Sequence, residues 1–335
     1  MQDNLTYAVA NCVKDILREV TQISPKDMPD IIWHYTNRDT LFKILETREI
    51  WSTHVSCLND TSECLILYDK LIEEFKSRNC EPFHAFLSQI EPKMLNKNFI
   101  MDSKWFVCSF SRYEDDQKLW DRYASGEAGC AIGFDPRKLL AWINCNRLPP
   151  RTPSDPTLSH SQELELKLAL NLILDNTPTF LLPTYYDETI QRSFVKRIAD
   201  EILKHWNNTS FHRSDEEYWA VWEDRLSVVA PLFKHDHYQY ENELRLLHKL
   251  ASGEECKLKY QSHESMTTRH LPLCYTEYFP IQRITVAQCR DQELTNRSVE
   301  NLKEAVDAHI AHAYANRFIR PVITVGISKL PFRSQ

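Results

Sequence analysis

Ile31-Ile32-Trp33-His34-Tyr35-Thr36, followed by Thr40-Leu41-Phe42-Lys43-Ile44-Leu45, is the stretch that decides how this chain folds. The first segment is a short apolar run ending on a histidine and a hydroxyl, which is typical of a strand. The second has apolar residues at helical spacing, with a cap expected near Asp39. Neutral histidine supplies one donor and one acceptor, so a strand presenting His34 and Thr36 is a candidate for holding a ribose and its phosphates. A histidine between aromatic residues also fits a core or rim position, and the residues alone leave both interpretations open.

Composition places the chain among globular proteins. It has 335 residues, of which 42% are hydrophobic, 26% charged and 11% aromatic, enough for a large core in one or two domains. No apolar run is long enough to span a bilayer, and Met1-Gln2-Asp3-Asn4 lacks the layout of a signal peptide. We therefore expect a cytoplasmic protein with no membrane partner. A net charge of −7 argues against broad, charge-driven binding to nucleic acid.

Cysteine and glycine usage excludes further classes. The ten cysteines form no C-x-x-C pair and no Cys/His spacing typical of zinc, so we expect neither a structural metal nor a disulfide framework. Only five glycines are present, without the spacing of a Rossmann dinucleotide fold or a P-loop NTPase. A bound nucleotide would therefore be held mainly by side chains.

Periodicity and turn residues predict strands and helices along the whole chain. Strands are expected at 31–35, 49–53, 104–111, 129–135, 243–247, 281–286 and 322–325. Helices are expected at 4–21, 39–47, 61–76, 115–124, 160–175, 187–207, from Ser214 with Glu217 completing a capping box, and at 293–313. A turn is predicted at 58–63, and the prolines of 148–158 predict a connector.

These elements predict an α+β fold with a mixed or antiparallel sheet, because regular βαβ alternation is absent. We expect a single domain over residues 1–335. Its sheet core would comprise 31–147 and 232–333, and 1–30 would form an N-terminal helix. Residues 148–231 would supply the proline-rich connector and a helical insert beside the cleft, a position suited to acceptor recognition or gating.

A series of short motifs in a fixed order carries a family resemblance. They are His34-Tyr35-Thr36, Leu58-Asn59-Asp60 with Glu63, Val107–Ser111, Leu119-Trp120 with Tyr123-Ala124, Gly129–Asp135, Tyr185-Tyr186-Asp187, Phe233-Lys234, Glu241–Leu246 and Ser328–Arg333. From about residue 31 to 333 this order resembles the DUF2971 family of mostly uncharacterised bacterial proteins. That family in turn resembles the ADP-ribosyltransferase superfamily, whose split sheet holds NAD without a Rossmann loop.

The resemblance implies site residues for NAD in the first half of the chain. His34 would bind a ribose of NAD, and Thr36, two positions on, would help to hold the cofactor. Ser109, Trp120 and Tyr123 are candidates for the wall that contacts the nicotinamide ring, because a flat ring gains from an aromatic face. Tyr123 is preferred for its hydroxyl and Trp120 follows closely, although their three-residue spacing also fits core packing.

The resemblance places the chemistry at Glu241-Asn242-Glu243. Nicotinamide leaves through an oxocarbenium-like transition state that a nearby carboxylate stabilises. Glu243 is the expected catalytic acid, Glu241 its acceptor-positioning partner, and Arg245 an ionic brace or phosphate contact. In a strand these three side chains share one face, an unusual set for a core. The alternative from the residues is an exposed edge strand with a salt bridge.

The implied function is that of an ADP-ribosyltransferase-like bacterial protein that uses NAD as substrate. It would modify a macromolecular acceptor, protein or nucleic acid, or hydrolyse NAD, as a toxin or defence effector; a toxin implies a cognate inhibitor protein. The alternative is a non-catalytic module on the same fold that binds a nucleotide or a protein. A metal-dependent nuclease is disfavoured, since Lys234, His235 and His237 better fit a solvated loop than a metal site. The catalytic interpretation requires His34, Glu243 and one of the two aromatic residues in one pocket; Arg333 has no role that the sequence assigns.

Overall fold

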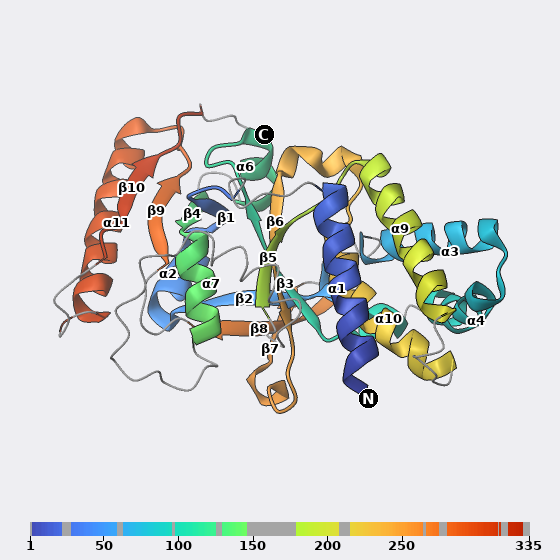
Figure 1. Ribbon diagram of the computed structural model, residues 1–335. Helices are drawn as coiled ribbons and strands as arrows, with labels where there is room; N and C mark the ends of the chain where they lie inside the picture. The colour runs from blue at the N-terminus through green and yellow to red at the C-terminus, as the bar shows by residue number, and fades with distance from the viewer. Residues whose placement is uncertain are drawn as a thin grey trace, which may run out of the picture.

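The computed structural model describes residues 2–21, 28–58, 63–95, 98–124, 129–145, 179–207, 215–263, 266–274, 280–313, 315 and 321–330. Within this part of the chain, ten strands form one sheet and helices flank it (Figure 1). Strands β10 and β9 are parallel, and the other strand pairs are antiparallel. The predicted α+β class and mixed sheet are therefore confirmed.

The sheet has a branched strand order. Its main path runs β10-β9-β4-β1-β3-β2-β8-β7, while β6 pairs with β3 and β5 pairs with β6. The strands are β1 Ile32–Asn37, β2 Glu49–His54, β3 Trp105–Ser111, β4 Gly129–Phe134, β5 Thr179–Pro183, β6 Glu243–Lys249, β7 Lys259–His263, β8 Met266–Cys274, β9 Ile281–Val286 and β10 Thr324–Ile327. Each strand predicted from the sequence corresponds to one of these.

The sheet divides at β3. One edge of β3 pairs with β6 along its whole length. On the other edge, Ser111 pairs with Trp33 of β1, whereas Val107 and Phe106 pair with β2. Strands β1 and β2 therefore diverge between Ser111 and Val107. On this edge, the middle of β3 pairs with neither of them. We call this place the fork.

The helices lie mainly in two groups, to the left and to the right of β5 and β6 in Figure 1. They are α1 Gln2–Thr21, α2 Arg38–Thr47, α3 Ile66–Arg78, α4 Glu81–Leu95, α5 Asn98–Met101, α6 Gln117–Tyr123, α7 Pro136–Cys145, α9 Glu188–Trp206, α10 Asp215–Val229 and α11 Gln292–Ala313. The described part of the chain also contains short 3₁₀ helices, which are η2 Val55–Cys57, η3 Glu63–Leu65, η6 Ala230–Leu232, η7 Asp236–Glu241 and η8 Glu255–Lys257.

Alternate side chains of the central strands β3 and β6 pack into two separate apolar cores. Val107 of β3 and Leu247 of β6 belong to the core that α1, α3, α4, α9 and α10 complete. Phe110 of β3 and Leu246 of β6 point to the other face, where α2 and α11 close a second core. Because side chains alternate across a strand, β3 and β6 each contribute to both cores. Any residue on β3 or β6 is thereby assigned to one face.

Two sequence predictions about this fold need correction. Residues 148–231 were expected to be connector and helical insert, but β5 within them joins the sheet beside β6. The cap of α2 is Asn37, one residue before the helix, and its side chain accepts a hydrogen bond from Thr40 N at 2.8 Å. Asp39 lies instead in the first turn. The predicted connector 148–158, the helix at 160–175, the turn residues 59–62, Ser214 and Arg333 lie outside the described residues.

Candidate functional site

Five charged side chains are buried together where η3, η6, η7 and β6 meet. Each has a side chain no more than 5% exposed. Asn242, at a positive φ of 42°, reverses the chain between η7 and β6, and asparagine is among the residues that tolerate this conformation. We call the group the ionic cluster; its members are Glu63, Lys234, Glu241, Glu243 and Arg245.

Lys234 sits at the centre of the ionic cluster. Its ammonium Nζ lies 2.5 Å from Glu241 Oε2, 3.0 Å from Glu243 Oε2 and 3.2 Å from Glu63 Oε1. An ammonium has three donors, so each proton of Lys234 has a carboxylate. These partners raise the pKa of Lys234 although burial acts to lower it.

Arg245 closes the other side of the ionic cluster. Its Nε donates to Glu243 Oε1 at 2.9 Å, Nη2 donates to Glu63, and Nη1 donates to the backbone carbonyl of Pro231. The planar guanidinium thus bridges two carboxylates and a 3₁₀ turn, which suits its fixed fork of donors. The arrangement also raises the pKa of Arg245 against the effect of burial.

Glu243 is the most strongly constrained carboxylate. Burial alone would raise its pKa, but the charges of Arg245 and Lys234 outweigh burial and, with a hydrogen bond from Ser109, lower it to about 2. Glu243 therefore stays ionised at neutral pH. Three carboxylates face two cations, so the ionic cluster carries a formal charge of −1.

Tyrosines surround the acidic side of the ionic cluster. Tyr123 Oη donates to Glu241 Oε1 at 2.8 Å, and burial, followed by the charge of Glu241, raises the pKa of Tyr123. Glu243 N donates to Tyr186 Oη at 3.1 Å. On the outer side, the guanidinium of Arg122 lies 5.0 Å from the ring centre of Tyr238 and 5.6 Å from that of Tyr123.

Ser109 and His34 meet at the fork. Ser109 is exposed, its hydroxyl interacts with Glu243, and its carbonyl oxygen lies 3.0 Å from His34 Nδ1. The His34 ring packs on Phe110, with ring centres 5.8 Å apart. Phe110 alternates with Ser109, so the ring of His34 lies on the opposite face of β3 from the ionic cluster, with Ser109 between them.

The structure brings together some predicted site residues and not others. Glu241, Glu243, Arg245 and Tyr123 form one contiguous group, and Ser109 adjoins it. Trp120 instead donates its Nε1 proton to Asp115 and packs edge-on against Tyr35. Thr36 is buried on β1 opposite Cys130 of β4. The expected single pocket with His34, Glu243 and an aromatic residue is not formed, because His34 lies on the opposite face of β3 and meets the Glu243 side only through Ser109.

Burial is where sequence reasoning was wrong. The segment from Glu243 was allowed to be an exposed edge strand, but β6 lies between β3 and β5 and its first six residues are buried. Lys234, expected in a solvated loop, is 4% exposed, whereas His235 and His237 are exposed as predicted. Glu63 was not considered; only its place in the quoted turn motif pointed to it.

Stability at acid pH tests the lowered pKa of Glu243. A carboxylate with a pKa of about 2 when folded and an ordinary value of 4.5 when unfolded stabilises the protein above pH 4.5. That contribution, on the order of 3 kcal/mol, is lost as the pH falls from 4.5 towards 2. We expect the urea unfolding free energy to fall across this window and to fall less in Glu243→Gln. Equal acid slopes for both proteins would contradict the depressed pKa.

Among the described residues, no group of three or more His, Cys, Asp or Glu side chains has an arrangement that could hold a metal ion. None of the described helices combines the length and apolar character needed to cross a membrane.

Comparison with protein families gives a match over part of the chain. Residues 119–246 match the family described as "Protein of unknown function (DUF2971)". The match supports the predicted family resemblance over this stretch, which holds Tyr123, Lys234, Glu241, Glu243 and Arg245 but not His34. Neither the curated proteins nor the solved structures gave a match.

Proposed function

We propose that this chain is an ADP-ribosyltransferase-like enzyme that uses NAD as substrate, with Glu243 as the charge that stabilises the transition state. The observation that carries the proposal is the ionised Glu243 beside exposed Ser109, at the fork of the sheet. Departure of nicotinamide leaves positive charge on the ribose, and a fixed anion stabilises that charge without reorganising.

The neighbours of Glu243 fit this role. Lys234 and Arg245 hold its carboxylate in one orientation and keep it ionised. Preorganisation of this kind contributes to catalysis because the enzyme does not reorient the charge during the reaction. Ser109 is exposed and interacts with Glu243, so the fork is the side from which a sugar would approach. His34, hydrogen-bonded to the carbonyl of Ser109, would contact the cofactor from the β1 side.

A second candidate is a non-catalytic module that binds a nucleotide or a protein. The observation that favours it is the saturation of the carboxylates: all four oxygens of Glu241 and Glu243 already have donors. A catalytic Glu243 would have to exchange one of these contacts for the substrate. In the alternative, the ionic cluster fixes η7 and β6 for a surface that binds a partner.

An assay with NAD separates the two candidates. The purified chain is incubated with NAD labelled in the adenosine part, with and without a bacterial lysate, and both free nicotinamide and labelled macromolecules are measured. Release of nicotinamide without labelled acceptor indicates hydrolysis, and release with labelled acceptor indicates transfer. Nuclease treatment then assigns the label to protein or nucleic acid. Binding of NAD without release supports the non-catalytic module, and absence of both binding and release refutes an NAD function.

A further inference from the structure

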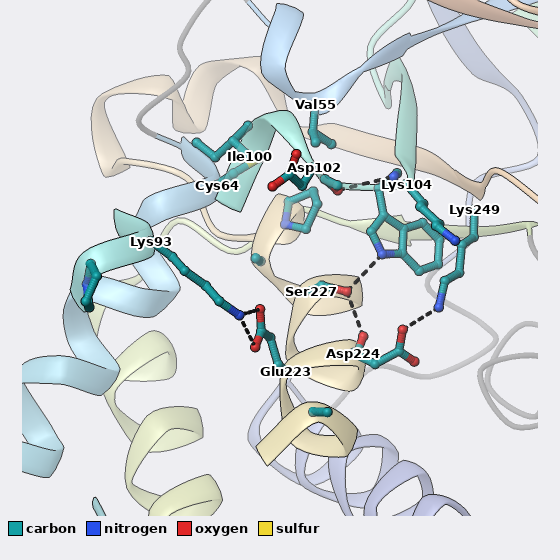
Figure 2. Close-up of a pocket in the computed structure, with 16 residues that line it drawn as sticks. Val55, Cys64, Lys93, Ile100, Asp102, Lys104, Glu223, Asp224, Ser227 and Lys249 are labelled. Atoms are coloured by element: carbon teal, nitrogen blue, oxygen red, sulfur yellow. Dashed lines mark hydrogen bonds and ion pairs between the residues drawn. The ribbon is translucent and has the colours of Figure 1, made fainter. Parts of the chain in front are cut away.

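A cavity of about 590 Å³ lies on the far side of the turns that support the ionic cluster (Figure 2). Cys64 of η3 lines it, whereas the preceding residue, Glu63, points into the ionic cluster. Pro231 of η6 also lines it, while the carbonyl of Pro231 accepts from Arg245. The cavity is therefore distinct from the ionic cluster, and its volume is in the range of small-molecule sites.

One wall of the cavity is apolar. Val55, Ile100 and Ala230 contribute aliphatic surface, and Trp105 of β3 contributes an indole. The Trp105 ring is fixed, because its Nε1 donates to Ser227 Oγ of α10 at 3.0 Å (Figure 2). A rigid aromatic surface beside aliphatic groups suits the flat or branched apolar body of a ligand.

The charged lining is balanced, and part of it is already paired. Three lysines and three carboxylates line the cavity. Lys93 pairs with Glu223 at 2.7 Å and Lys249 pairs with Asp224 at 2.5 Å. Within each of these two pairs the charges cancel. One carboxylate and one ammonium of the cavity lining remain.

The remaining two charges are Asp102 and Lys104. Both are exposed, and neither side chain forms a hydrogen bond or an ion pair with any residue that the structure describes. They are separated by one residue on the segment between α5 and β3. Figure 2 shows Asp102 apart from the two ion pairs and Lys104 next to Lys249. The cavity thus offers a ligand one negative and one positive partner beside an apolar wall.

We propose that this cavity binds a small zwitterion with an apolar body, of the class of an apolar α-amino acid. Lys104 would pair with the ligand carboxylate and Asp102 with its ammonium, while the apolar body packs against Trp105. A ligand with a single charge would satisfy only one of the two groups and leave the other unpaired. The proposal does not depend on an NAD function, since none of these residues belongs to the ionic cluster.

Three ligands that share an indole test the proposal on the full chain. L-tryptophan carries both charges, tryptamine lacks the carboxylate, and indole-3-propionate lacks the ammonium. Dissociation constants are measured by ligand-observed NMR. We expect L-tryptophan to bind about 3- to 10-fold more tightly than either analogue, because each partly exposed ion pair contributes a few-fold in affinity. Equal affinities for the three ligands, or no binding, would overturn the proposal.

Two variants assign the two charges separately. Asp102→Asn should weaken L-tryptophan and tryptamine about 3- to 10-fold and leave indole-3-propionate unchanged. Lys104→Met should weaken L-tryptophan and indole-3-propionate and leave tryptamine unchanged. Both residues are exposed, so the fold is retained. A uniform effect of either variant on all three ligands would count against the assignment.

Control variants locate the binding. Ala220 lies exposed on α10 and lines the cavity, so Ala220→Phe should weaken binding of all three ligands by narrowing the cavity. Lys303→Met, on the exposed face of α11, removes a lysine elsewhere and should change nothing. Unchanged binding in Ala220→Phe would place the ligand outside the cavity and refute the proposal.

Discussion

Arg245→Met is expected to lower the unfolding free energy by about 3–5 kcal/mol, the typical cost of removing one partner from a buried ion pair. Arg245 is 2% exposed and bridges Glu243, Glu63 and the Pro231 carbonyl. Its removal leaves the ionic cluster with three carboxylates and one cation. Methionine preserves much of the side-chain volume, so the loss arises mainly from charge. Chemical denaturation at pH 7 measures it.

An exposed arginine provides the matched control for Arg245→Met. Arg192 also contacts two carboxylates, Glu73 and Glu188, but its side chain is half exposed. Exposed ion pairs contribute about 0–1 kcal/mol, so Arg192→Met should change stability little. Similar losses for both variants would show that the buried ionic cluster contributes no more than surface pairs. Adding Glu63→Gln to Arg245→Met should restore part of the stability, because it removes one unpaired carboxylate.

The spacing of residues in the β6 segment made part of the candidate site predictable. Glu243 and Arg245 alternate with Leu244 and Leu246, so a strand with charges on one face followed directly from the spacing. Their burial did not follow, because the balancing groups come from distant 3₁₀ turns: Glu63 precedes Arg245 by 182 positions. Lys234 is close in sequence, but a 3₁₀ helix and a reversal at Asn242 direct it back to the carboxylates. No local period encodes such contacts.

The missed elements have equally specific causes. β5 is a five-residue strand that ends on Pro183, and prolines around a short apolar run favour a loop prediction. β7 is Lys-Tyr-Gln-Ser-His, too polar to be recognised as a strand without its partner β8. α4 contains Pro92 within the helix, a residue that normally interrupts one. In each case pairing or packing with another segment outweighs the local preference.

The position of His34 could not be read from its motif either. The sequence places His34 at the end of a strand, but only the register of β1 with β3 decides its face. A shift of one residue would move its ring to the side of Glu243, because side chains alternate along a strand. With the observed register, His34 and Glu243 are linked through Ser109 rather than facing each other. A cofactor that contacts both would occupy the fork.

Glu243→Gln is expected to lower the rate of nicotinamide release by about 10²–10³, provided that the proposed NAD function holds. Glutamine preserves size and hydrogen bonding but removes the negative charge opposite the developing oxocarbenium. The affinity for NAD should change little, because ground-state contacts at His34 and Tyr123 remain. His34→Ala should show the reverse balance and weaken NAD binding first. Single-turnover kinetics and equilibrium binding measure the two effects separately.

Glu63→Gln separates a loss of charge at the reaction centre from a loss of structure. It removes one carboxylate from the same ionic cluster, since Glu63 contacts Lys234 and Arg245, but it comes from η3 and not from β6. Both variants take the formal charge of the ionic cluster from −1 to 0, and chemical denaturation measures the stability that each one loses. Only Glu243→Gln should then lose 10²–10³ in rate. Equal rates for the two variants would remove Glu243 from the chemistry and favour the non-catalytic module, in which the ionic cluster serves the fold alone.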